Sequence, residues 1–226
     1  GRGVSKNDEE VCRYYKMSAD KGFKEAMFNY GIMLERGLGV SKNEEEACRY
    51  YKMSADKGFI NALNGYGLML LDGRGVSKNE EEACRYFKMS ADKGFKEAMY
   101  NYGLMLEIGR GVSKNEEEAC RYFKMAVDKG HINALNSYGL MLLEGRGVSK
   151  NEEEACRYLK MAADKGFMVA MYNYGLMLEI GRGVSKNEKE ACRYFKMAAD
   201  KGHINAKDKY TQMIDKLWGS CLYIYK

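Results

Sequence analysis

The string GRGVSKNEEEACRYFKMAADKG returns six times along this chain, with a few letters changed between copies. Internal repetition constrains the fold more than any local pattern, because every copy must adopt the same structure and neighbouring copies must bury each other's apolar faces. We therefore predict a stack of similar units. One cysteine marks each copy, at intervals of 36 residues: Cys12, Cys48, Cys84, Cys120, Cys156 and Cys192.

The first half of each full repeat predicts an amphipathic helix. In the copy that starts near residue 24, Ala26, Tyr30 and Leu34 fall on one helical face. Gly31 costs about 1 kcal/mol in a helix interior. Its recurrence in later copies indicates that another helix crosses close to it. Gly37 is expected to end this helix.

The second half of the repeat has a clear helix start. Asn43 can cap the helix, and Glu46 follows three residues later, in the capping-box arrangement. Tyr51 lies on the apolar stripe with Cys48 beside it, and Gly58 supplies a left-handed residue after the last turn. Each repeat is therefore predicted to be a helical hairpin, which needs neighbours to bury its apolar faces.

The regular spacing of the cysteines argues against a metal site. Stacked helices lie about 8–10 Å apart, whereas zinc–sulfur bonds of about 2.3 Å require sulfur atoms much closer together. We interpret the six repeated cysteines as small buried hydrophobic residues, with Cys221 left over. This cysteine usage favours a reducing compartment, so a cytoplasmic location is preferred.

The pattern AxxxYGxxL…GxGVxxN…EAxxYYxxSADKG resembles the Sel1-like repeat, a relative of the tetratricopeptide repeat with a longer loop inside each hairpin. The resemblance covers residues 1 to about 217. Usual members have Leu-Gly in place of Tyr30-Gly31, Asp in place of Asn43 and often Trp in place of Tyr50. Some members carry paired cysteines in each repeat, whereas this chain has one. The resemblance implies an all-α fold, a right-handed α-α superhelical solenoid, with no catalysis.

We expect one solenoid domain over residues 1–226. It starts with a half repeat, continues with five full hairpins and ends with a capping helix and a tail. These segments are 1–22, 23–58, 59–94, 95–130, 131–166, 167–202, 203–218 and 219–226.

The last helix, HINAKDKYTQMIDKLW, predicts the end of the array. Ala206, Tyr210 and Met213 continue the inward apolar stripe, whereas Lys207 and Asp215 stand where an earlier copy has leucines. A helix that is apolar on one side and charged on the other is typical of a solenoid cap. We expect the array to end here and to begin upstream of this chain.

The resemblance places the first helices of the hairpins on a concave inner face, where we expect a protein or peptide partner to bind. The candidate contacts occupy repeat positions that correspond to 25, 28, 32 and 35 of the first hairpin. They are Glu25, Phe28, Ile32, Glu35, Asn64, Leu68, Tyr100, Leu104, Glu107, Asn136, Leu140, Tyr172, Leu176 and Glu179.

Two of these positions alternate between neighbouring repeats, so the effective unit is two repeats long. Position 28 alternates between an aromatic residue and Asn, and position 35 alternates between Glu and Leu. Aromatic rings offer contact area at small entropic cost, and Asn can pair with a peptide backbone. The glutamates favour a basic partner. Two alternatives stay open: the alternation records duplication of a two-repeat block, or position 28 packs against the next repeat.

The composition excludes several other functions. The chain is 46% hydrophobic and 31% charged, and its net charge of +5 arises from interleaved signs. This is not the pattern of a nucleic-acid-binding protein, and no apolar run is long enough to cross a membrane. His131 and His203 occupy a slot that holds Phe in other copies. Because polar residues recur in equivalent copies, we predict no enzyme, no metal site and no cofactor.

The leading functional prediction is an adaptor or scaffold that binds another protein, as the resemblance implies. A second interpretation is a regulatory array in a longer protein that also has a catalytic or membrane domain. A third is a structural or self-associating solenoid, including one designed from a consensus. We expect a mostly monomeric chain. The apolar tail CLYIYK offers a route to self-association, by entering the groove of a neighbouring molecule.

Overall fold

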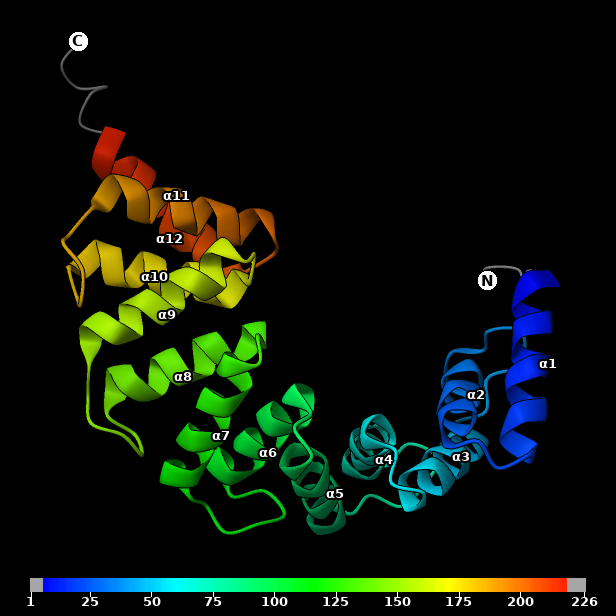
Figure 1. Ribbon diagram of the computed structural model, residues 1–226. Helices are drawn as coiled ribbons and strands as arrows, with labels where there is room; N and C mark the ends of the chain where they lie inside the picture. The colour runs from blue at the N-terminus through cyan, green and yellow to red at the C-terminus, as the bar shows by residue number, and fades with distance from the viewer. Residues whose placement is uncertain (1–5, 219–226) are drawn as a thin grey trace. The chain divides into compact units, whose positions relative to one another are not determined.

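The computed structural model describes residues 6–218, where it has twelve α-helices and no strand, which confirms the all-α class (Figure 1). The helices divide into two compact units, unit 1 up to Asn115 and unit 2 from Glu116 onward. The helices of unit 1 are α1 (Lys6–Asp20), α2 (Lys24–Arg36), α3 (Glu44–Asp56), α4 (Ile60–Asp72), α5 (Glu80–Asp92) and α6 (Lys96–Ile108). Those of unit 2 are α7 (Glu116–Asp128), α8 (Ile132–Glu144), α9 (Glu152–Asp164), α10 (Met168–Ile180), α11 (Glu188–Asp200) and α12 (Ile204–Trp218).

Both units are built from helical hairpins, in which a first helix leads into a second through the loop with the GxGVSKN motif. The pairs α2–α3 and α4–α5 form hairpins in unit 1, and α8–α9 and α10–α11 do so in unit 2. Within a unit, each helix packs against the helices before and after it in the chain. A single domain over the whole chain stays a prediction.

The second helices begin where the capping pattern predicts. In α3, the side-chain oxygen of Asn43 accepts a hydrogen bond from the backbone N–H of Glu46 at 3.0 Å. The Asn43 amide also donates to the Glu46 carboxylate at 3.4 Å. A cap of this kind contributes about 1 kcal/mol to helix stability. The same bond fixes the start of α5, α9 and α11.

The mid-helix glycine allows the two helices of a hairpin to cross closely. A Cβ atom at Gly31 would lie 2.8 Å from the ring of Tyr51 on α3. The equivalent atom at Gly175 would lie 2.7 Å from the ring of Phe195 on α11. Real Cβ atoms do not approach this closely, so any larger residue would push the helices apart. The close crossing expected from the sequence is confirmed, and the crossing helix is the second helix of the same hairpin.

The loop inside each hairpin also packs against the second helix that precedes that hairpin. Gly39 has φ +67°, a left-handed conformation that favours glycine. A Cβ atom on Gly39 would overlap the backbone carbonyl of Asp8 in the first turn of α1. Gly183 in unit 2 has the same relation to Glu152. The second glycine of the GxG motif therefore lets the loop lie directly on the preceding second helix.

The last helix has a buried apolar side and an exposed charged side, and its role as a cap stays a prediction. Ala206 and Met213 are buried, and α12 packs on α11, whereas Lys207 and Asp215 are exposed. The tail at 219–226, with Cys221 and the CLYIYK segment, lies outside the described residues. Within residues 6–218, each helix is too short or too polar to cross a membrane.

Candidate functional site

Five of the predicted contact residues surround one pocket in unit 1. Phe28, Ile32 and Glu35 reach it from α2, and Asn64 and Leu68 reach it from α4. We call the surface formed by these five residues the first-helix face of unit 1. Its pocket has a volume of about 300 Å³, and its wall is completed by residues that include Phe95 and Arg74. The structure thus brings together residues from two neighbouring repeats.

The aromatic residue at position 28 packs between hairpins. The Phe28 ring centroid lies 5.4 Å from that of Tyr51 on α3 and 5.4 Å from that of Phe59, the residue before α4. In unit 2, Tyr172 lies 5.8 Å from Phe195 and stacks on His203 at 4.5 Å. Phe28 and Tyr172 therefore follow the alternative in which position 28 packs against the next repeat, although Phe28 still lines the pocket.

The asparagines at position 28 differ from the expectation that they face a peptide. Asn64 and Asn136 are 8% and 7% exposed. The oxygen of Asn64 accepts a hydrogen bond from the side-chain amide of Asn101 at 2.9 Å, and Asn136 accepts one from Asn173 at the same distance. Their amides are therefore used in packing α4 on α6 and α8 on α10. The alternation at position 28 therefore corresponds to two kinds of contact between hairpins. One is made by aromatic rings and the other by side-chain amides.

Glu35 is compensated inside the chain. The Tyr51 hydroxyl donates a hydrogen bond to one carboxylate oxygen at 2.6 Å, and Arg74 donates to the other at 2.5 Å. Burial alone would raise the pKa of Glu35, but these two hydrogen bonds hold the pKa below its ordinary value. In unit 2, Lys209 binds both carboxylate oxygens of Glu179, at 3.0 and 2.9 Å. The expectation of a basic partner therefore has no support at Glu35 or Glu179.

The other predicted residues lie on the same side of their helices. Glu25 is exposed at the start of α2. Position 32 keeps a half-exposed apolar side chain in every full repeat, which makes it the accessible apolar part of the predicted surface. The predicted residues in α6, α8 and α10 that are partly exposed are Tyr100, Leu104, Glu107, Leu140, Tyr172, Leu176 and Glu179.

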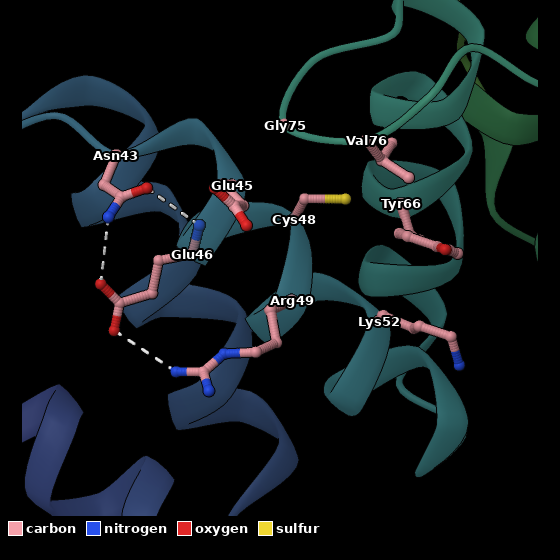
Figure 2. Close-up of a pocket in the computed structure, with 9 residues that line it drawn as sticks. All are labelled: Asn43, Glu45, Glu46, Cys48, Arg49, Lys52, Tyr66, Gly75 and Val76. Carbon is pink, nitrogen blue, oxygen red and sulfur yellow. Dashed lines mark hydrogen bonds and ion pairs between the residues drawn. The ribbon is translucent and has the colours of Figure 1, made fainter.

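A second and more polar hollow lies between α3 and α4, and the sequence analysis did not predict it. Figure 2 shows Asn43, Glu46 and Arg49 linked along one wall, with the sulfur of Cys48 directed toward the helix that carries Tyr66. Its volume is about 520 Å³. Unit 2 has an equivalent hollow beside Asn151 and Arg157. The helix-capping residues Asn43 and Glu46, which the sequence assigned only to the start of α3, therefore also line this hollow.

The repeated cysteines are buried in the helical core. The six repeated cysteines are each 3–4% exposed. Burial raises the pKa of Cys48, Cys120 and Cys156 to about 11. Among residues 6–218, no group of three or more His, Cys, Asp or Glu side chains is placed to hold a metal ion.

The two histidines do more than fill an aromatic slot. Nδ1 of His131 accepts a hydrogen bond from the backbone N–H of Ala134, and Nδ1 of His203 accepts one from Ala206, both at 3.2 Å. At Phe23 and the other phenylalanines before first helices, no side chain makes such a bond. The imidazoles therefore cap α8 and α12, which the sequence pattern did not indicate.

Comparison with solved structures supports the same architecture. A Sel1 repeat protein from Oxalobacter formigenes has a TM-score of 0.86 and 28% identity, over 91% of this chain and 82% of that protein. A protective antigen of uropathogenic Escherichia coli that displays an SLR fold has a TM-score of 0.83 and 22% identity. That match covers 92% of this chain but only 45% of the antigen. At 22% identity this match shows the fold alone. A comparison with curated proteins gave no match.

The repeat model of one family covers almost all of the helical region. The Sel1 repeat matches residues 1–23, 24–59, 60–95, 96–131, 132–167 and 169–203. The fold of this family is a non-catalytic helical scaffold, and its members generally bind protein partners. The chain belongs to the Sel1 repeat family.

Proposed function

We propose that this chain is an interaction scaffold that binds an extended segment of a partner protein along the first-helix face of unit 1. The observation that supports this most is the pocket that Phe28, Ile32, Glu35, Asn64 and Leu68 share. Binding pockets are typically concave and mostly apolar, with a few polar groups that orient the ligand.

The chemistry of the pocket favours an apolar anchor on the partner. Ile32 and Leu68 are half-exposed, and their side chains lose water when a bulky apolar group covers them. Glu35 already accepts hydrogen bonds from Tyr51 and Arg74. A cation from the partner would have to compete with Arg74. We therefore propose that a large aliphatic or aromatic side chain of the partner enters the pocket.

The backbone of the partner can be held by polar side chains at the rim. Asn61 lines the pocket and is half-exposed. Its amide has both a donor and an acceptor, so it can pair with a peptide group. Asn64 is buried on Asn101, so we assign it to the packing of α4 on α6.

The test is affinity capture from a lysate of the source cells, with three forms of the chain. The first is the wild-type chain, and the second carries Ile32→Lys and Leu68→Lys on the first-helix face. The third is a matched control with Met53→Lys and Met89→Lys, two exposed second-helix positions. Circular dichroism first establishes that all three fold.

We expect a protein that the wild type and the control retain and that the Ile32→Lys, Leu68→Lys form loses by about tenfold or more, because central apolar contacts dominate binding energy. Retention of the same proteins by all three forms would overturn the proposal. If only the Met53→Lys, Met89→Lys control lost the retained protein, the binding surface would lie on the second helices instead. Absence of any retained protein would favour the self-associating alternative, which light scattering over a concentration series would then reveal.

A further inference from the structure

The methionines of this chain fall into two classes that follow the repeat. Of the 16 methionines, nine are in the core of the units, all on first helices or on α12, and are at most 7% exposed. These nine core methionines are Met27, Met33, Met69, Met99, Met105, Met141, Met171, Met177 and Met213.

The second helices carry the other repeated methionine. It follows the lysine of the CRY-x-KM motif, once in each copy. Five of these residues have 37–50% of their surface exposed, and we call them the outer methionines. They are Met17, Met53, Met89, Met125 and Met161. Met197 has the same repeat position and is partly exposed. Met168, on α10, is 37% exposed and lies outside this series.

The six repeated cysteines do not compete with the outer methionines for oxidants. Thiols react with peroxide as thiolates. The repeated cysteines are 3–4% exposed, and burial raises the pKa of Cys48 to about 11, which suppresses the thiolate. Thioethers need no deprotonation, so exposure decides which of them react. Among residues 6–218, the most exposed sulfur-containing residues are therefore methionines.

We propose that the outer methionines are a repeated modification site, at which peroxides convert the thioether to a sulfoxide while the helical core stays intact. A sulfur lone pair attacks one peroxide oxygen and forms the S–O bond as the O–O bond breaks. The departing hydroxide takes the proton from the oxygen that is now bound to sulfur, and it leaves as water. Sulfur loses two electrons and hydrogen peroxide gains them, so each site consumes one peroxide. This inference is independent of the proposed function.

The structure explains why the fold tolerates this reaction. An outer methionine such as Met53 projects from α3 beside Lys52 and Asp56, which form an exposed ion pair at 2.9 Å. The added oxygen is polar and can stay in water at such a place. At Met69, which is 0% exposed, the same oxygen would be buried among apolar side chains. Peroxide can reach Met69 only when the hairpin opens.

The experiment treats the full chain with hydrogen peroxide and follows each methionine by peptide mapping with mass spectrometry. Far-UV circular dichroism monitors the helices during the reaction. We expect the outer methionines to gain one oxygen each about tenfold or more faster than the core methionines, because local opening of a packed helix costs free energy. The helical signal should not change during this phase.

Matched variants test the assignment of the sites. Met53→Leu with Met89→Leu should remove two equivalents of fast peroxide consumption, whereas Met69→Leu with Met141→Leu should remove none. Leucine conserves the volume of methionine well enough for both variants to fold. Equal rates at outer and core methionines in a chain with an unchanged helical signal would overturn the proposal. Loss of the helical signal before the outer methionines react would also overturn it.

Discussion

Helices α2 and α4 of unit 1 occupy the same repeat positions as α10 and α12 of unit 2. The side chains that these two helix pairs expose are nevertheless different. In unit 1, Gly65 lines the pocket and lies against the Phe28 ring. In unit 2, Lys209 stands at the position of Gly65 and binds Glu179. The pocket residues Asn64 and Leu68 are also replaced, by Asp208 and Gln212, so several side chains distinguish the two surfaces. The repeat conserves the framework, and single positions on it determine the surface.

The close helix crossing at the mid-helix glycine should contribute equally to the stability of both units. Gly31→Leu and Gly175→Leu would each drive a side chain into the ring of the paired second helix, at Tyr51 and Phe195 respectively. We expect each variant to lower the free energy of unfolding by about 2–3 kcal/mol or more. Urea titration followed by circular dichroism measures this loss, with Lys52→Leu on the exposed side of α3 as control. A loss at only one end would show that the two hairpins do not share this crossing.

The amide pair is a feature that both units keep. Asn64→Ala would leave the Asn101 amide without its partner, and we expect a loss of about 1–3 kcal/mol. The equivalent Asn136→Ala, opposite Asn173, should cost a similar amount. A double-mutant cycle with Asn64→Ala and Asn101→Ala measures the coupling in urea unfolding. Additive effects would contradict a direct bond between these side chains.

One difference between the two helix pairs, the residue at the position of Gly65, can be tested by substitution. Gly65→Lys copies Lys209 into unit 1, so we expect it to fill the pocket and to weaken partner binding by about tenfold. Gly65→Ser is the matched control, because Ser137 occupies the same position in α8. A Cβ atom at Gly65 would lie 3.3 Å from the Phe28 ring, so both variants require a small shift of that ring. Binding by titration calorimetry decides the outcome, and equal affinity of the two variants would place the partner elsewhere.

The smallest expected effect is the pH dependence of stability that arises from Glu35 in unit 1. Because the pKa of Glu35 is below its ordinary value in the folded chain, its contribution to stability is present above the unfolded pKa, about 4.5. That contribution is lost as the pH falls through the lower, folded value. Glu35 is partly exposed, so solvent screening limits the effect to less than about 1 kcal/mol. The difference in thermal stability between wild type and Glu35→Gln should be full at pH 7 and should shrink as the pH falls below 4.5 through the folded pKa of Glu35. Parallel curves over this range would contradict the prediction.

The sequence predicted the local structure well because local chemistry controls it. The Asn43 and Glu46 capping pattern, the αL glycine at 37 and the mid-helix Gly31 each act within one hairpin. Burial of the repeated cysteines also follows from their place beside an apolar stripe. The partly exposed leucine and isoleucine of position 32 were assigned to the surface by the family resemblance instead.

The contacts between hairpins were not predictable in the same way. Comparison of repeats aligns residues 36 apart, whereas the structure pairs residues that are not equivalent in the repeat. Asn64 meets Asn101, which is 37 residues away, and Arg74 meets Glu35, which is 39 residues away. The predicted roles of Asn64 and Glu35 changed because their partners occupy other repeat positions.

The sequence by itself determined the helices, their ends, the period and the family, since each depends on residues within one turn or one hairpin. Only the tertiary structure decided which polar groups are free to meet a partner. The offset between stacked helices places Arg74 on Glu35 and Asn101 on Asn64, and it leaves Ile32 and Leu68 beside an open pocket. A buried polar group must find a partner wherever the packing brings one. That geometry arises between hairpins, at distances along the chain that no single repeat contains.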